Sequence, residues 1–239
     1  MKLIRCAGYE PMSRAAAECI TDVLAHKRDA VLCAAAGNSP TGLYRELARA
    51  AQRDPDLFAA VRIVKLDDWL GVPPDHPASC EYYVRSNVVE PLRIDSERYL
   101  GFRPDAVNPV QECGRVQTRL DRLGLDVCIL GLGANGHIGL NEPAPSLEVG
   151  CHVAVLTEES RRHRLLADLD PKPTHGITLG IGDILRARKI VLLITGQGKE
   201  RAVSGLLSGK LTTAVPASLL AVHDDVAVFI DESSVTAGT

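Results

Sequence analysis

Aromatic side chains, excess positive charge and long apolar runs are scarce or missing in this sequence. Only 4% of the 239 residues are aromatic, which leaves few platforms on which single-stranded nucleic acid could stack. Lys and Arg number 27 against 30 Asp and Glu, a balance that gives no sign of a polyanion surface. No apolar run approaches the ~20 residues of a membrane helix, and no signal-peptide stretch opens the chain. We therefore expect no nucleic-acid partner, no membrane association and a cytoplasmic location.

Paired cysteines and metal-ligand spacings are also missing. The seven cysteines are widely spread and include no C-x-x-C pair, which is typical of reduced, mostly buried thiols and not of a disulfide framework. The histidines at 26, 76, 175 and 223 show no ligand spacing with each other or with cysteine. We expect no bound metal.

Apolar patterning predicts an α/β fold. Continuous apolar runs at 30–36, 127–132, 190–195 and 226–230 suit parallel strands buried on both faces. Residues 62–66 are a fifth candidate, and 3–6, 98–102, 152–156 and 176–179 are weaker ones. Apolar stripes at helical spacing cover 12–24, 43–51, 113–123 and 202–207. With no internal linker or repeat, residues 1–239 are expected to form one domain. Its core would be a single doubly wound, largely parallel, Rossmann-like sheet with helices on both faces.

Ligands of such folds bind beyond the carboxyl ends of the strands, so we expect the functional residues in the loops there. The segment GNSPTG at 37–42 follows the first strong strand. Small residues let the backbone close around an anion, and the next helix offers free N–H groups. Its spacing is that of a nucleotide P-loop, but Leu43 and Tyr44 stand where Lys and Ser/Thr are required. A tight turn with Ser39 or Thr41 capping the helix is equally compatible.

Two adjacent acids, Asp67 and Asp68, come directly after the strand at 62–66. Neighbouring carboxylates repel, which raises the pKa of at least one of them, and such a carboxyl can shuttle protons. For an isolated pair, a solvated turn or a helix cap is the commoner explanation.

The segment GLGANGHIGLNEP at 131–143 contains the dinucleotide fingerprint G-x-G-x-x-G after a strong strand. That fingerprint requires an amphipathic helix directly after its last glycine, and Pro143 and Pro145 stand there instead. We therefore reject a nicotinamide site. The loop does supply His137 and Glu142, and a carboxylate near a histidine can orient and charge it for proton transfer.

Two basic segments are further candidates for anion binding. Lys199 ends the segment GQGK at 196–199, between a strand and a helix. The run RRHR at 161–164 is most often a solvated helix face but could close over a phosphate.

Four segments together resemble a known family: GNSP (37–40), LDDW (66–69), GANGHIGLNEP (133–143) and TLG (178–180). Over nearly its whole length the chain resembles the glucosamine-6-phosphate deaminase/isomerase family, most closely its galactosamine-6-phosphate branch. The related 6-phosphogluconolactonases share the fold and the Gly-His pair but lack the Asn-Glu-Pro continuation found at 141–143. A non-catalytic sugar-phosphate sensor of similar architecture is another alternative, and the intact Asp67, His137 and Glu142 count against it.

The resemblance implies an aldose–ketose isomerisation coupled to loss of ammonia, without metal or organic cofactor, acting on a small amino-sugar phosphate. Asp67 would be the base that moves the C2 proton to C1. His137 would open the sugar ring, with Glu142 holding its protonation state. Asn135 stands where the family usually has Asp, and it can orient groups through hydrogen bonds.

The resemblance also assigns substrate-binding residues. The 6-phosphate would be held by the loop at 37–39, by Lys199 and by an arginine. That arginine has no secure match: Arg161 is our choice, with His163 and Arg164 nearby. The full substrate-binding set is Gly37, Asn38, Ser39, Asp68, Lys199 and Arg161. Exposed apolar faces in such folds often pair, which would give a homo-oligomer.

Overall fold

The four continuous apolar runs form the centre of a seven-stranded sheet in the computed structural model, which describes residues 1–233. All neighbouring strands in this sheet are parallel, as expected for strands connected by crossover helices. The order across the sheet is β1 (Lys2–Cys6), β10 (Val226–Asp231), β9 (Lys189–Ile194), β6 (Val127–Gly131), β2 (Val31–Ala34), β3 (Arg62–Lys65) and β5 (Tyr99–Leu100). The doubly wound fold predicted from the sequence is confirmed.

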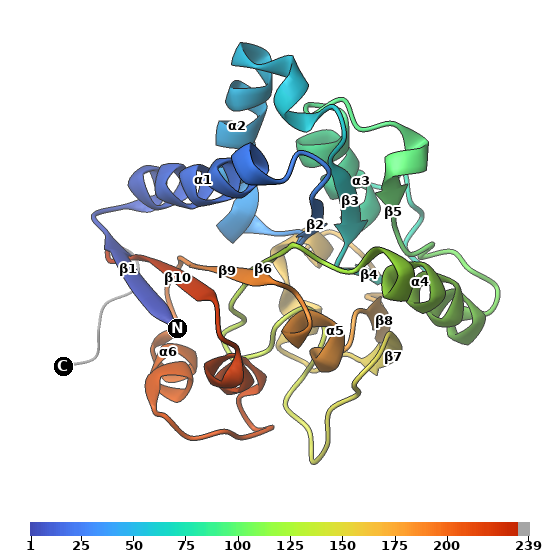
Figure 1. Cartoon of the computed structure of the whole chain (residues 1–239). Coiled ribbons are helices and arrows are strands. Elements are labelled where there is room, and N and C mark those ends of the chain that lie inside the picture. Colours follow the sequence, from blue (N-terminus) through green and yellow to red (C-terminus); the bar gives the residue numbers. More distant parts are fainter. Residues whose placement is uncertain (234–239) are drawn as a thin grey trace.

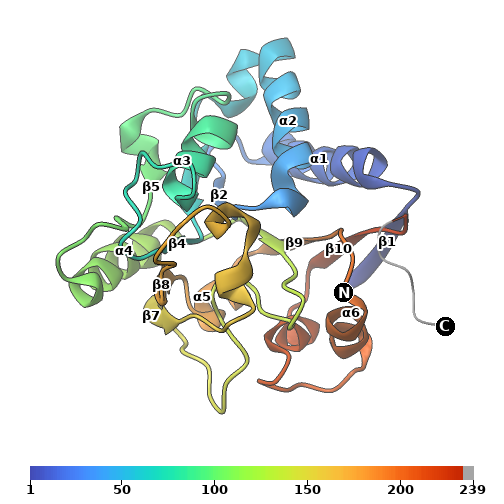
Figure 2. The same ribbon diagram turned by 180° about the vertical axis from the view of Figure 1, so that it is seen from behind.

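Helices cover both faces of this sheet (Figures 1 and 2). One face packs against α1 (Tyr9–His26), α2 (Asn38–Arg53) and α3 (Cys80–Val84), and the other against α4 (Pro109–Leu123), α5 (Ile181–Leu185) and α6 (Glu200–Leu207). The stripe predicted on the first helix is buried, with Met12, Ile20 and Leu24 fully inaccessible to solvent. A separate apolar core lies on each face, so the central strands are buried on both sides.

A second, smaller sheet lies at the carboxyl ends of the parallel strands. It is antiparallel and contains β4 (Asp67–Trp69), β8 (His175–Thr178) and β7 (His152–Val155), in that order. The sequence predicted one strand over 62–66, whereas the chain leaves the large sheet after Lys65 and joins the small one at Asp67. An acidic pair cannot continue a strand that is covered by apolar side chains on both faces, so the change of sheet occurs where the acids begin.

All seven cysteines lie within the described residues and are free thiols. Over residues 1–233, no helix is both long and apolar enough to cross a bilayer.

Candidate active site

A cavity of about 810 Å³ opens where β2, β6 and β9 end and β4 begins. Its walls come from the strand-end loops around residues 37–41 and 131–140 and from residues 159–165, which lie between β7 and β8. This last segment, gold in Figure 2, passes in front of the sheet near the start of α2. Six residues selected from the sequence line the cavity: Gly37, Asn38, Ser39, Asp67, His137 and Lys199. The other four, Asp68, Asn135, Glu142 and Arg161, are not among its lining residues.

One end of the cavity is formed by the first turn of α2. Gly37 occupies the N-cap position with φ 110°, a left-handed conformation that favours glycine. The predicted cap by Ser39 or Thr41 is wrong, because within the described chain no side chain caps this helix. Thr41 Oγ1 instead donates to the Gly37 carbonyl at 2.9 Å and lies 2.6 Å from the Tyr83 hydroxyl. The N–H groups of Asn38 and Ser39 precede the first bonds within the helix and are therefore left for an anion in the cavity.

Lys199 reaches the same cavity from the start of α6. Burial lowers the pKa of its amine to about 8, so the group carries its charge near neutral pH but loses it in mild alkali. Arg164 also lines the cavity, with Nη1 3.5 Å from Asn38 Oδ1. Arg161 instead pairs with Glu158 at 2.8 Å. Arg164, and not Arg161, therefore lies beside the turn at 37–39, and Arg162 is a second arginine of the cavity wall.

The Asp67 carboxyl lies partly exposed at the cavity wall. Burial and the neighbouring charge of Asp68 raise its pKa to about 7, against a lowering by His137 and Lys65. A carboxyl with this pKa exchanges a proton readily at neutral pH, which is the requirement for a general base.

Asp68 faces the opposite way and is completely buried, because successive side chains of a strand alternate between its faces. Its carboxylate accepts N–H bonds from Trp69, Cys80 and Glu81 at 2.8, 3.0 and 2.9 Å, and a bond from the Lys65 amine at 2.6 Å. We expected Asp68 to bind substrate, but its side chain is buried behind the cavity wall and does not line the cavity. The alternative of a solvated turn is also wrong, since Asp68 caps the first turn of α3.

His137 projects from the glycine-rich loop after β6. Its Nδ1 lies 3.3 Å from Glu142 Oε2 and 3.3 Å from Ser160 Oγ. The ring lies so close to Gly133 that a Cβ there would come within 2.4 Å of Nε2. Glycine is therefore required at 133 to leave room for the imidazole. After this loop the chain forms no helix before β7, which agrees with rejecting the dinucleotide fingerprint.

Asn135 and Glu142 hold the histidine from behind. The Asn135 amide donates to Glu142 Oε2 at 3.0 Å, while its Oδ1 accepts the His137 backbone N–H at 3.0 Å. Burial raises the pKa of Glu142, but His137, Ser160 and Asn135 together lower it further than burial raises it. Glu142 is thus a carboxylate at neutral pH and can orient the imidazole through its contact with Nδ1.

His163, which the sequence suggested only as a neighbour of the phosphate-binding arginine, lines the cavity. His163 stacks obliquely on Trp69, with ring centroids 5.6 Å apart. Burial, followed by the charges of His137 and Lys199, lowers the pKa of His163 to about 4, so this second imidazole is neutral. Ser160 and Cys80 also line the wall. These residues carry no local sequence pattern that would have indicated them. Among residues 1–233, no three His, Cys, Asp or Glu side chains are grouped so as to hold a metal ion.

Comparison with known proteins identifies the family. Residues 9–229 match the family model of glucosamine-6-phosphate isomerases and 6-phosphogluconolactonases. The chain belongs to this family. A relative from Escherichia coli (strain K12), named "Putative deaminase AgaI", is 38% identical over 94% of this chain and 89% of its own length.

Solved structures of the family have the same fold. A monomeric glucosamine-6-phosphate deaminase superposes with a TM-score of 0.92 at 37% identity, covering 97% of both chains. A 6-phosphogluconolactonase from Trypanosoma brucei gives a TM-score of 0.75 at 22% identity, covering 97% of this chain and 96% of its own. The second likeness shows the fold alone.

Proposed function

We propose that this family member is an amino-sugar-6-phosphate deaminase. In this proposal it converts galactosamine 6-phosphate to tagatose 6-phosphate and ammonia, with glucosamine 6-phosphate as the next candidate substrate. The observation that carries the proposal is one cavity with three suitable parts: an anion seat, a carboxyl that titrates near pH 7, and a histidine backed by a carboxylate. The galacto preference rests on the resemblance described from the sequence.

The phosphate group would lie against the first turn of α2, at Gly37, Asn38 and Ser39, with Lys199 opposite. A dianion there gains N–H donors, the helix dipole and an ammonium together. Arg164 is a better candidate than Arg161 for the guanidinium that completes this seat, because it lines the cavity and lies beside Asn38.

Proton transfer would be carried out by Asp67. It would take the proton from C2 of the open-chain sugar and return it to C1, which moves the double bond through an enolamine. This leaves a C=N bond at C2, to which water adds before ammonia leaves. A positioned general base typically contributes about 10²–10⁴-fold to such a step.

Ring opening would be the task of His137, which can move a proton between the ring oxygen and the C1 hydroxyl. Glu142 and Asn135 would keep the imidazole in place from behind. The reaction needs neither metal nor organic cofactor in this scheme. We expect the enzyme to act as one domain over 1–239, in the cytoplasm, on a small sugar phosphate.

Ammonia release from the two amino-sugar phosphates, measured in parallel with the ketose identified, tests the proposal. Formation of tagatose 6-phosphate from the galacto sugar supports it in full. Preference for the gluco sugar keeps the mechanism and changes the substrate. No release from either sugar, together with hydrolysis of 6-phosphogluconolactone, would replace it with lactonase activity. No turnover of any of the three compounds would favour a sensor.

A further inference from the structure

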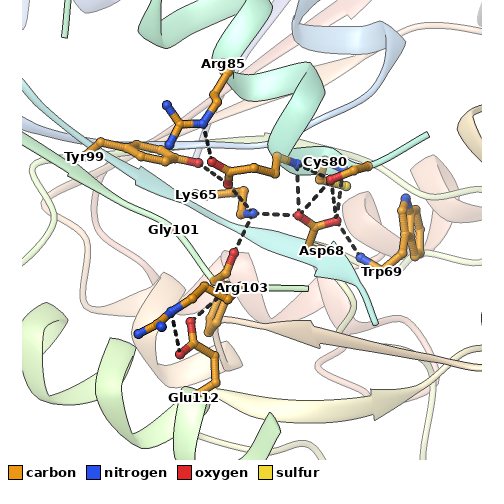
Figure 3. Close-up of polar contacts among 12 residues, drawn as sticks. Lys65, Asp68, Trp69, Cys80, Arg85, Tyr99, Gly101, Arg103 and Glu112 are labelled. Atoms are coloured by element: carbon orange, nitrogen blue, oxygen red, sulfur yellow. Dashed lines mark hydrogen bonds and ion pairs between the residues drawn. The ribbon is translucent and has the colours of Figure 1, made fainter. Parts of the chain in front are cut away.

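Charged side chains meet around the buried amine of Lys65, and Asp68, the neighbour of Asp67 along the chain, is one of them (Figure 3). The centre of this cluster is Lys65, the last residue of β3, whose side chain has no solvent exposure. The amine donates to Asp68 Oδ2 and Glu81 Oε2, both at 2.6 Å, and to the Phe102 carbonyl at 2.8 Å. These three bonds use all three N–H donors of the ammonium.

The outer part of the cluster is formed by hydrogen bonds to Glu81. Glu81 accepts from the Tyr99 hydroxyl at 2.7 Å and from Arg85 Nε at 2.7 Å, and the Arg85 guanidinium lies 5.2 Å from the centre of the Tyr99 ring. A Cβ at Gly101 would come within 2.8 Å of the Tyr99 oxygen and 3.0 Å of Glu81 Oε2. Close packing at Gly101 therefore holds Tyr99 and Glu81 in place, whereas Arg85 is 49% exposed at the outer edge of the cluster.

Buried ions cost free energy, and stability alone rarely explains them. This cluster meets the site through Asp68, which is the residue next to Asp67 and accepts the N–H groups of two residues of the cavity wall, Trp69 and Cys80. The Asp68 carboxyl accepts hydrogen bonds from the amine of Lys65, from the N–H of Trp69 and from two N–H groups at the start of α3. The link between β4 and α3 is thereby fixed, with the Asp67 carboxyl facing the cavity.

We propose that Lys65 and Asp68 are positioning residues for the proton transfer: together they aim the Asp67 carboxyl at the cavity and set the net charge beside it. The proposal rests on Asp67 being the base of the proposed function. Asp68 opposes ionisation of Asp67, and Lys65 partly offsets that effect. Neither side chain contacts the cavity itself.

Other groups near Asp67 do not replace this pair. His137, facing it from the loop after β6, is the third charge that acts on it, and it favours the ionised form. Thr178, its partner on β8, is uncharged. Two thiols also face Asp67: Cys80 from α3 and Cys33 from β2. Burial is the largest cause that raises the pKa of each, so both stay neutral.

The direct test is the titration of Asp67, followed by carboxyl ¹³C NMR of protein labelled at aspartate. Its resonance is identified by its loss in Asp67→Asn. In wild type we expect a midpoint near pH 7. Asp68→Asn removes the opposing charge and should lower the midpoint by about one pH unit. Lys65→Met removes the offsetting charge while the start of α3 still holds Asp68, and should raise the midpoint. These opposite shifts come from one cluster, so loss of either variant to misfolding leaves the other as a test.

Glu81→Gln is the matched control. It also replaces a carboxylate bonded to the Lys65 amine at 2.6 Å, yet Glu81 is not among the groups that shift Asp67. Its midpoint should match that of wild type. Equal shifts in Asp68→Asn and Glu81→Gln, or no shift in a folded Asp68→Asn or Lys65→Met, would overturn the proposal.

Solvent deuterium exchange at C2 of the amino-sugar phosphate is measured on the same proteins. The acidic limb of its pH profile should move with the NMR midpoint of each variant. Wild-type protein that shows no exchange with either sugar would refute the proposed function, whereas the titration would still decide the role of Lys65 and Asp68.

Discussion

Replacing Lys65 by methionine tests how much the buried cluster contributes to the fold. Methionine keeps most of the length and apolar volume but removes the ammonium and its three hydrogen bonds. Asp68 is then left without its cation, and Glu81 keeps only Arg85 and Tyr99. Removing one partner from a fully buried ion pair typically costs 3–5 kcal/mol, since the remaining charge is uncompensated. We expect the free energy of unfolding to fall by about 4 kcal/mol at pH 8.

The pH dependence of that loss has a definite sign. In wild type the partners raise the pKa of Lys65 above 10.5, and this stabilising contribution is lost only as pH rises through the raised value. Burial raises the pKa of Glu81, but Lys65 and its other partners lower it further, to below the ordinary value of 4.5. The contribution of Glu81 to the free energy of unfolding is therefore present above pH 4.5 and is lost as the pH falls through the lowered pKa. In Lys65→Met a stranded carboxyl takes up a proton on acidification. The deficit should therefore shrink between pH 8 and pH 5.

Urea unfolding followed by circular dichroism at several pH values measures both effects. Arg5→Gln is the control, because it removes an exposed ion pair with Glu232 whose side chains are 52% and 47% exposed. Such surface pairs contribute at most about 1 kcal/mol. A loss in Lys65→Met no larger than that of the control, or one independent of pH, would refute the reasoning.

Four further predictions concern the cavity. Asp67→Asn should lower kcat by about 10²–10⁴-fold and abolish solvent exchange at C2 while substrate still binds, and exchange that persists would remove Asp67 as the base. The folded state holds the proton of Asp67 more tightly than the unfolded state does, because the pKa of this carboxyl is raised. The free energy of unfolding of wild type should therefore fall as the pH rises from about 4 to about 7, and urea titration should show no such fall in Asp67→Asn. His137→Gln should slow turnover of the closed-ring substrate more than that of an open-chain analogue, and equal losses would exclude it from ring opening. The KM of wild type should rise above about pH 8, as Lys199 loses its proton. Lys199→Gln should show a high KM at every pH, without that rise, and a KM equal to that of wild type in this variant would place the phosphate elsewhere.

The parallel sheet could be predicted because the residues of each strand indicate by themselves that the strand is buried on both faces. Strands buried on both faces must be apolar at every position, and the runs that became β2, β6, β9 and β10 are continuous for that reason. The small antiparallel sheet was not predicted as a separate unit. Its strands are short, and their partners come from distant parts of the chain: Asp67 lies opposite Thr178.

The sequence by itself determined which chemical groups are present at the strand ends: the small residues at 37–42, the acidic pair, the His137–Glu142 loop and Lys199. It could do so because loops that follow buried strands must lie at one edge of the sheet. It could not tell which acid of the pair faces the cavity, since Asp67 and Asp68 are chemically alike. The tertiary structure decided that through strand alternation and through a lysine whose cation can be buried only among carboxylates brought from β4 and α3. The pKa of Asp67 is raised by the burial of Asp67 itself and by the neighbouring charge of Asp68. The larger cause, burial, arises only when the chain is folded.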